Sequence, residues 1–121
     1  MTLKIRSAIL LLFVAALAWA CNRAPAPAPI YSIAADKSYE SSLFRQNCAI
    51  CHGPEAQGNI LDNGTKVPSL RTGEFKFHTE DEIYKQIANG GNGMTPFRDQ
   101  LTERELHLMA QFVHDKLRKQ Q

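Results

Sequence analysis

The chain has 121 residues, which is enough for one domain of ordinary size. Apolar residues make up 44% and charged residues 21%, a balance typical of a globular protein and not of a disordered or fibrous one. The formal net charge is only +2, and no stripe of lysine and arginine runs along the sequence, which argues against a nucleic-acid-binding protein. Three cysteines, an odd number, argue against a closed disulfide framework.

Residues 1–20 are predicted to form a secretory signal peptide. Lys4 and Arg6 supply a positive start, and the mostly apolar stretch that follows carries no charge. That stretch is short of the roughly 20 apolar residues that span a bilayer comfortably. Ala18-Trp19-Ala20 is an A-x-A cleavage pattern, so we expect the mature chain to begin at Cys21.

The same junction resembles the box of bacterial lipoproteins, in which the first mature residue is a cysteine that receives lipid. The match is imperfect, because Leu17 stands one place too early and Trp19 occupies a position that usually holds a small residue. We expect a membrane tether through lipid on Cys21. A free N-terminal thiol and retention of residues 1–20 as an uncleaved anchor are the alternatives.

Residues 21–35 are expected to form a tether, and residues 36–121 the globular domain. Pro25, Pro27 and Pro29 alternate with alanine, which favours extended polyproline geometry and makes a semi-rigid spacer. Such a spacer suits a domain held off a membrane. A leader segment with no role of its own is the alternative.

The domain is predicted to be all-α, with three amphipathic helices. The first covers about residues 37–48, with Tyr39, Leu43 and Phe44 on one face. The other two begin with T-x-x-E capping boxes at Thr79 and Thr102. Helical spacing predicts that these two helices bury the following residues: Ile83, Ile87, Ala88, Leu106, Met109, Phe112, Val113 and Leu117.

The helices are separated by two glycine-containing segments. Gly90-Gly91 is expected to end the second helix. Residues 53–73 are rich in Gly, Pro and Asn and show no alternating strand pattern, so we expect a loop of about 20 residues. A loop of that length in so small a domain needs something to order it.

The chemistry is concentrated in the C-x-x-C-H motif of residues 48–52, which is the attachment motif of c-type haem. Thiols three positions apart can each form a thioether to one vinyl group of a haem. A thioredoxin-like pair would want a βαβ context, and a zinc site would want four closed ligands, so both alternatives are weaker. We expect covalent haem c attached through Cys48 and Cys51, with His52 as an iron ligand. The secretion signal supports this expectation, because haem attachment occurs outside the cytoplasm.

A second iron ligand is predicted at Met94, in a glycine-rich loop between two helices. A thioether is a soft ligand, and His/Met ligation raises the haem reduction potential. Methionine is more often core filler, which fits Met109 at its helical spacing but fits Met94 poorly between Gly and Pro. Three histidines are rival ligands, for which ordinary surface or core roles are favoured: His78, His107 and His114.

The globular part resembles a bacterial class I c-type cytochrome with one haem. The resemblance rests on Leu43-Phe44 before the C-x-x-C-H-G motif, the turn at residues 67–70, the Met94 loop with Pro96-Phe97, and the amphipathic terminal helix. Thr95 departs from the Met-Pro pair of many members. The resemblance implies a small all-α fold in which the first and last helices cross beside the haem.

Specific contacts follow from this resemblance. It implies that Phe44 packs near Phe112, and that the Pro68 carbonyl accepts a hydrogen bond from Nδ1 of His52, which would fix the imidazole. Arg71 could pair with a haem propionate or remain solvated. Ten apolar residues are candidates for the haem pocket, of which we expect about half to line it: Ile60, Leu61, Val67, Leu70, Phe75, Phe77, Ile83, Ile87, Phe97 and Met109.

The function indicated is one-electron transfer in a respiratory or related redox chain, because saturated His/Met ligation leaves no position open for a substrate. An electron-entry subunit fixed in a larger oxidoreductase complex is the alternative, and a haem enzyme or gas sensor is a more distant one. We expect a monomer on the periplasmic face of a bacterial membrane, with a redox protein as donor and another as acceptor. Basic and acidic residues alternate on the expected surface, so the sequence identifies neither partner.

Overall fold

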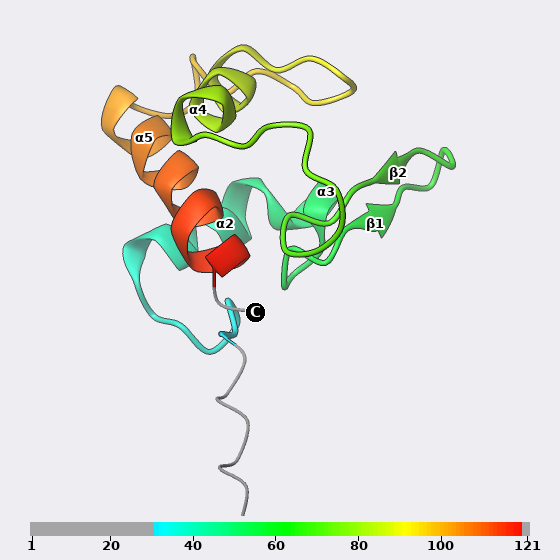
Figure 1. Cartoon of the computed structure of the whole chain (residues 1–121), viewed down its shortest axis with the longest axis horizontal. Helices are drawn as coiled ribbons and strands as arrows, with labels where there is room; N and C mark the ends of the chain where they lie inside the picture. Colours follow the sequence, from blue (N-terminus) through cyan, green and yellow to red (C-terminus); the bar gives the residue numbers. More distant parts are fainter. Residues whose placement is uncertain (1–30, 120–121) are drawn as a thin grey trace, which may run out of the picture.

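A computed structural model describes residues 31–119 (Figure 1). The predicted signal peptide, Cys21 and most of the predicted tether lie outside these residues, and they stay predictions. Between residues 31 and 119, no helix has the length and apolar character needed to cross a membrane.

The first helix ends at the C-x-x-C-H motif. Helix α2 spans Tyr39–Asn47, and the Ser38 side chain caps it by accepting a hydrogen bond from the Ser41 backbone N–H. Leu43 and Phe44 are buried, as their spacing predicts. Tyr39, expected on the same face, is instead 59% exposed, and its hydroxyl donates to the carboxylate of Glu105.

Helices α4 (Glu80–Asn89) and α5 (Glu103–Gln111) both begin with the predicted capping boxes. Thr79 Oγ1 accepts from the Glu82 N–H at 3.2 Å, and Thr102 Oγ1 accepts from the Glu105 N–H at 3.3 Å. In each box the glutamate side chain accepts in return from the threonine N–H. Helix α4 ends at Gly90, whose φ of +67° suits glycine.

The C-terminal helix changes character after α5. Residues Phe112–Leu117 form a π-helix, η1, which the sequence does not predict. The Phe112 N–H still bonds the carbonyls of Leu108 and Met109, four and three residues earlier, so the wider π-helical bonding begins after this residue. In this geometry Lys116 Nζ lies 2.9 Å from Glu40 of α2.

The core lies where α2, α4, α5 and η1 meet (Figure 1). Phe44 of α2 and Phe112 of η1 pack with ring centroids 5.9 Å apart, which confirms the expected contact between the first and last helices. All eight residues predicted to be buried on α4 and the C-terminal helix are buried. Ile33, which precedes α2, is also fully buried.

A small hairpin projects from the helices (Figure 1). Strands β1 (Asn59–Ile60) and β2 (Lys66–Val67) pair antiparallel, with Asn59 opposite Val67. The hairpin lies inside the segment that the sequence predicts to be a loop. Two-residue strands are too short to show the alternation by which a strand is found in a sequence. The fold is therefore the expected small all-α fold with one added hairpin.

Candidate functional site

The C-x-x-C-H motif forms one tight helical turn. Helix α3 (Ala49–His52) follows α2 directly, with Cys48 as the shared cap. The His52 N–H donates to the Cys48 carbonyl at 2.9 Å, which closes the turn. Residues three apart on a helix lie on the same side, so the thiols of Cys48 and Cys51 lie on one side of this turn. Cys48 is half-buried and Cys51 is exposed.

The Cys48 thiol does not have the electrostatics of a reactive cysteine. Burial raises the pKa of the Cys48 thiol to about 12, with a smaller contribution from Cys51. Reactive cysteines of redox enzymes have a lowered pKa. The structure gives no support to the thioredoxin-like alternative. Among residues 31–119 no cluster of three or more His, Cys, Asp or Glu is arranged to hold a metal, so the zinc alternative gains none either.

His52 is a half-buried, neutral imidazole. Burial lowers its pKa, and the nearby Pro68 carbonyl opposes that shift. A neutral imidazole is the form that binds metals. Nδ1 of His52 is buried and has no partner at full hydrogen-bond geometry, although the Pro68 carbonyl is near enough to act on the pKa of the imidazole. The hydrogen bond to Pro68 implied by the resemblance stays a prediction.

A glycine holds the Pro68 turn close to His52. The Gly58 N–H donates to the His52 carbonyl at 2.8 Å, and the Leu70 N–H donates to the Ala56 carbonyl at 2.9 Å. A Cβ atom at Gly58 would lie 2.7 Å from the Val67 carbonyl oxygen, closer than real Cβ atoms approach backbone. Gly58 therefore permits residues 67–69 to pack against the segment that follows the motif.

Met94 lies in a closed loop after α4. Gly91 and Met94 exchange backbone hydrogen bonds of 2.8 and 3.0 Å. The Phe97 N–H then donates to the Ile87 carbonyl at 3.0 Å, so the chain returns onto α4. A side chain at Gly90 would meet the Met94 carbonyl at 2.6 Å. Met94 itself is partly buried against the core, and the loop fixes its backbone from both ends.

The ten candidate pocket residues divide by location. Four of them are buried in the protein core: Ile83, Ile87, Phe97 and Met109. Six lie in residues 60–77 and keep some exposure: Ile60, Leu61, Val67, Leu70, Phe75 and Phe77. Apolar side chains gathered in one irregular segment give a surface that a flat apolar group can cover. Together with the paired thiols and the neutral imidazole, they fit a covalently attached haem.

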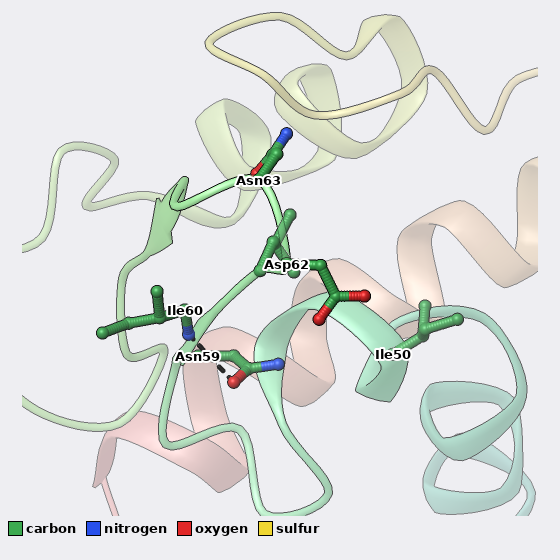
Figure 2. A pocket seen from close by; sticks show the side chains of 6 residues that line it. Ile50, Asn59, Ile60, Asp62 and Asn63 are labelled. Carbon is green, nitrogen blue, oxygen red and sulfur yellow. Dashed lines mark hydrogen bonds between the residues drawn. The ribbon is translucent and has the colours of Figure 1, made fainter.

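A separate shallow pocket lies between α3 and the hairpin (Figure 2). Its volume is about 380 Å³, and Figure 2 shows Ile50 on one side and Asn59 to Asn63 on the other. None of Cys48, His52 and Met94 lines it. The chemistry of the motif therefore lies outside this pocket.

The guanidinium of Arg71 is not solvated, because it is bonded inside the domain. Its side chain is only 12% exposed, and Nη2 lies 3.1 Å from a carboxylate oxygen of Glu55. Nη1 donates to the Tyr31 carbonyl at 2.8 Å, and Nε donates to the Glu55 carbonyl. This internal network replaces the free solvation that was one of the two expectations, whereas pairing with a propionate stays a prediction.

Glu55, which the sequence analysis did not single out, is the centre of that network. Its carboxylate accepts from Ser32 Oγ at 2.9 Å and from the N–H groups of Ile33 at 2.8 Å and Ala34 at 2.9 Å. We call Glu55, Arg71 and residues 31–36 the Glu55 clamp. Residues 31–35, which the sequence assigns to the tether, are packed against the domain here. The partners are separated by more than 15 residues, so no local pattern marks them.

The three rival histidines lie on the surface or near it. His107 is exposed and stacks on Tyr84 with centroids 4.4 Å apart. Nδ1 of His114 lies 2.8 Å from Asp115. His78 is exposed just before the α4 cap.

The turn with two thiols and an imidazole, the Met94 loop and the crossing helices together define a c-type cytochrome domain. Residues 40–113 match the family described as "Cytochrome C oxidase, cbb3-type, subunit III". This chain belongs to that family of c-type cytochromes, as the resemblance predicted.

Individual proteins that are similar to this chain also carry cytochrome names. The cytochrome c6 of Thermosynechococcus vestitus is 30% identical over 88 residues, which cover 73% of this chain and 77% of the relative. The cbb3-type cytochrome c oxidase subunit FixP of Sinorhizobium medicae is 33% identical over 84 residues, covering 60% of this chain and 27% of FixP. The cytochrome bc1 complex cytochrome c subunit of Corynebacterium diphtheriae is 37% identical over 65 residues, covering 54% of this chain and 21% of that subunit. No solved structure gives a significant match.

Family membership confirms several predictions. The chain is an electron-transfer protein and not an enzyme, and its cofactor is a covalently attached haem c. Cys48 and Cys51 stand in the motif that such attachment uses. The chain works with a redox partner, outside the cytoplasm.

Proposed function

We propose that the chain transfers single electrons between a donor and an acceptor protein, and that His52 and Met94 would be the two protein ligands of its haem iron. The haem supplies the ferric/ferrous couple when it is bound. Cys48 and Cys51 would hold the haem through two thioethers, and the neutral imidazole of His52 would bind its iron. A hydrogen bond from Nδ1 to the Pro68 carbonyl would orient that imidazole, and the effect of this carbonyl on the pKa of His52 supports the proposal.

The observation that carries this proposal is the closed Met94 loop. Reciprocal hydrogen bonds between Gly91 and Met94 fix the backbone of the methionine, and α4 anchors the loop on both sides. A ligand held in this way leaves little freedom for exchange with an external molecule. This favours electron transfer over a gas-binding or catalytic site with a labile ligand.

The experiment replaces Met94 with Ala. The oxidised wild-type protein is expected to show the weak charge-transfer band of a ferric iron–thioether bond. Met94→Ala should erase the band, lower the reduction potential because the thioether favours the ferrous state, and open the iron to added carbon monoxide. Met109→Leu, a change of similar volume in the core, should keep the band. Rapid, complete binding of carbon monoxide by the wild type, with no band, would contradict the proposal.

A second candidate is a fixed electron-entry subunit of a larger complex. The FixP and bc1 relatives carry the names of such subunits, which supports this alternative. Recovery of the chain in a stable complex after mild solubilisation of membranes would select it. Recovery as a free monomer would select the mobile carrier.

We also propose the targeting arrangement indicated by the sequence. Residues 1–20 are a signal peptide, residues 21–35 a tether whose last five residues pack on the domain, and residues 36–121 the cytochrome domain, with lipid on Cys21 at the periplasmic face of the membrane. Cys21→Ser should abolish lipid labelling and release the domain from membranes. Continued membrane retention of that variant would point to an uncleaved anchor.

A further inference from the structure

Arg118 is a half-buried arginine without a carboxylate partner in the described part of the chain. It directly follows η1, and its one hydrogen bond to another described residue runs from Nη1 to the Phe77 carbonyl at 2.6 Å. Its Nε is buried and has no partner among residues 31–119. A guanidinium is a planar fork of several N–H donors, so most of the donors of Arg118 are left unpaired.

The other lysines and arginines of residues 31–119 are either exposed or joined to a carboxylate. Among the half-buried ones, Arg71 Nη2 lies 3.1 Å from the Glu55 carboxylate, and Lys116 Nζ lies 2.9 Å from the Glu40 carboxylate. Their charges are therefore neutralised within the domain. Arg118 is the half-buried cation whose charge the described residues leave uncompensated.

This arrangement of Arg118 costs free energy unless an anion completes it. Burial lowers the pKa of Arg118, and no neighbouring carboxylate opposes that shift. An arginine side chain nevertheless stays protonated in proteins, so the group remains a cation. Buried charges are normally paired, because an unpaired charge loses its hydration without compensation. The environment of Arg118 therefore fits an anion that residues 31–119 do not supply.

The surroundings of Arg118 indicate which anion this is. Its guanidinium carbon lies 4.0 Å from the ring centroid of Phe75, a cation–π contact that holds the charged group in place. Phe75 and Phe77 are half-buried and belong to the apolar residues of the segment 60–77 that fit a haem. Arg118 thus lies beside that apolar surface. A haem is apolar across its ring and also carries propionate carboxylates, so the group that covers these side chains brings anions with it.

We propose that Arg118 binds a propionate of the covalently attached haem through the N–H donors that Phe77 leaves unpaired. Hydrogen bonds between a guanidinium and a carboxylate are charge-assisted and among the stronger ones in proteins. The pair would tie the end of the C-terminal helix to the cofactor, in addition to the attachment through the C-x-x-C-H motif. This inference needs the bound haem, but it does not depend on the ligation of iron by Met94.

The test compares variants of the holoprotein by resonance Raman spectroscopy of the haem propionates. Arg118→Met keeps an apolar stem, removes the cation and its donors, and should shift the propionate bending mode. Arg118→Lys keeps the charge without the planar fork and should give a smaller shift. Arg104→Met is the matched control, because Arg104 is an exposed arginine without a salt bridge, and it should keep the wild-type mode. A propionate mode that is unchanged in Arg118→Met would overturn the inference.

A free anion in the solvent is the competing occupant, and inorganic phosphate is the probe for it. If Arg118 binds a propionate, phosphate should raise the thermal midpoint of the wild type no more than sodium chloride of equal ionic strength does. A specific rise in phosphate that is lost in Arg118→Met would show that the cation is open to solvent anions, which overturns the inference.

The outcomes are separate from those of the proposed function. The charge-transfer band reports on Met94 and should persist in Arg118→Met, together with the helical content of the wild type. A shifted propionate mode in a variant that keeps both properties comes from the lost pair and not from a disrupted fold. If the mode does not shift, the role of Arg118 is wrong while the ligation by Met94 stands.

Discussion

The helical part of the molecule and the segment of residues 53–78 achieve order in different ways. Helices α2, α4, α5 and η1 bury nearly all of their large apolar side chains against one another. Within residues 53–78, by contrast, only Gly53 and Ala56 are buried. The helical part therefore has a core of its own, whereas the apolar side chains of the second region retain surface for a cofactor to cover.

Polar contacts at a few points fix the path of residues 53–78. The Glu55 clamp holds one end, and Arg118 of the C-terminal helix donates to the Phe77 carbonyl at 2.6 Å near the other. Between them, the close approach at Gly58 fixes the Pro68 turn. The comparison shows that a long irregular segment can keep a defined path without its own apolar core when its backbone is held at separated points.

The largest effect is expected in the helical core. Phe112 is 2% exposed and packs against Phe44 and against Tyr31 at 6.1 Å. Phe112→Ala should lower the free energy of unfolding by about 3–5 kcal/mol, measured by denaturant titration of the holoprotein. Lys66→Ala, at an exposed position in strand β2 of the hairpin, should stay within about 0.5 kcal/mol of the wild type. Equal losses in the two variants would break the comparison between the two regions.

An intermediate, pH-dependent effect is expected at the Glu55 clamp. Burial by itself would raise the pKa of the Glu55 carboxyl, but donors from Ala34, Ile33 and Ser32 outweigh it and hold the pKa below the ordinary value of 4.5. A lowered pKa stabilises the fold above the unfolded-state pKa, and this stabilisation is lost as the pH falls through the folded-state pKa. Glu55→Gln should cost about 1–2 kcal/mol at pH 7, since the carboxylate is 35% exposed.

The difference between the wild type and Glu55→Gln should be constant from about pH 6 to 8 and shrink below about pH 4. The exposed Glu74 supplies the control, and Glu74→Gln should change stability by less than about 0.5 kcal/mol at pH 7. A difference at Glu55 that grows on acidification would show that the carboxylate does not hold the clamp in its charged form.

The smallest effect is expected at a helix cap. Thr102→Ala removes the two hydrogen bonds that Thr102 Oγ1 makes, from the Glu105 N–H and to the Glu105 carboxylate, and should lower the free energy of unfolding by about 1 kcal/mol. Thr65→Ala, an exposed threonine in the hairpin, should change it by less than about 0.5 kcal/mol. A larger loss at Thr65 than at Thr102 would mean that local helix signals contribute less to this fold than the hairpin does.

The helices were predictable because their signals are local. Each capping box lies within four residues, and the buried positions of α4 and α5 repeat at helical spacing. The π-helix η1 was not predictable, because the carbonyl that each N–H selects depends on tertiary packing around Phe112. Tyr39 was placed on the buried face by the same spacing, but its position at the first turn lets its hydroxyl reach Glu105 on another helix.

The site was only partly predictable for the same reason. The C-x-x-C-H motif is contiguous, and Met94 is marked by its neighbouring glycines and proline. No local sequence pattern indicates the roles of Glu55 and Arg71, since the partners of their side chains are 16 to 40 residues away. The hydrogen bond between Lys76 and Asn92 likewise joins residues 16 apart, through a loop conformation that spacing does not reveal.

The Glu55 clamp gives the domain a mechanical property. Tension on the chain ahead of Tyr31 would load the bonds of Ile33 and Ala34 to Glu55, and the bond from Arg45 to the Ile33 carbonyl, before it reached α2. Release of residues 31–36 would lengthen the chain by at most about 20 Å. Single-molecule pulling from the N-terminal side should show this short extension before the helices yield, and Glu55→Gln should lower the force at which it occurs. A pull from the N-terminal side would therefore break the hydrogen bonds of the clamp before it unfolded the helix that leads to the haem motif.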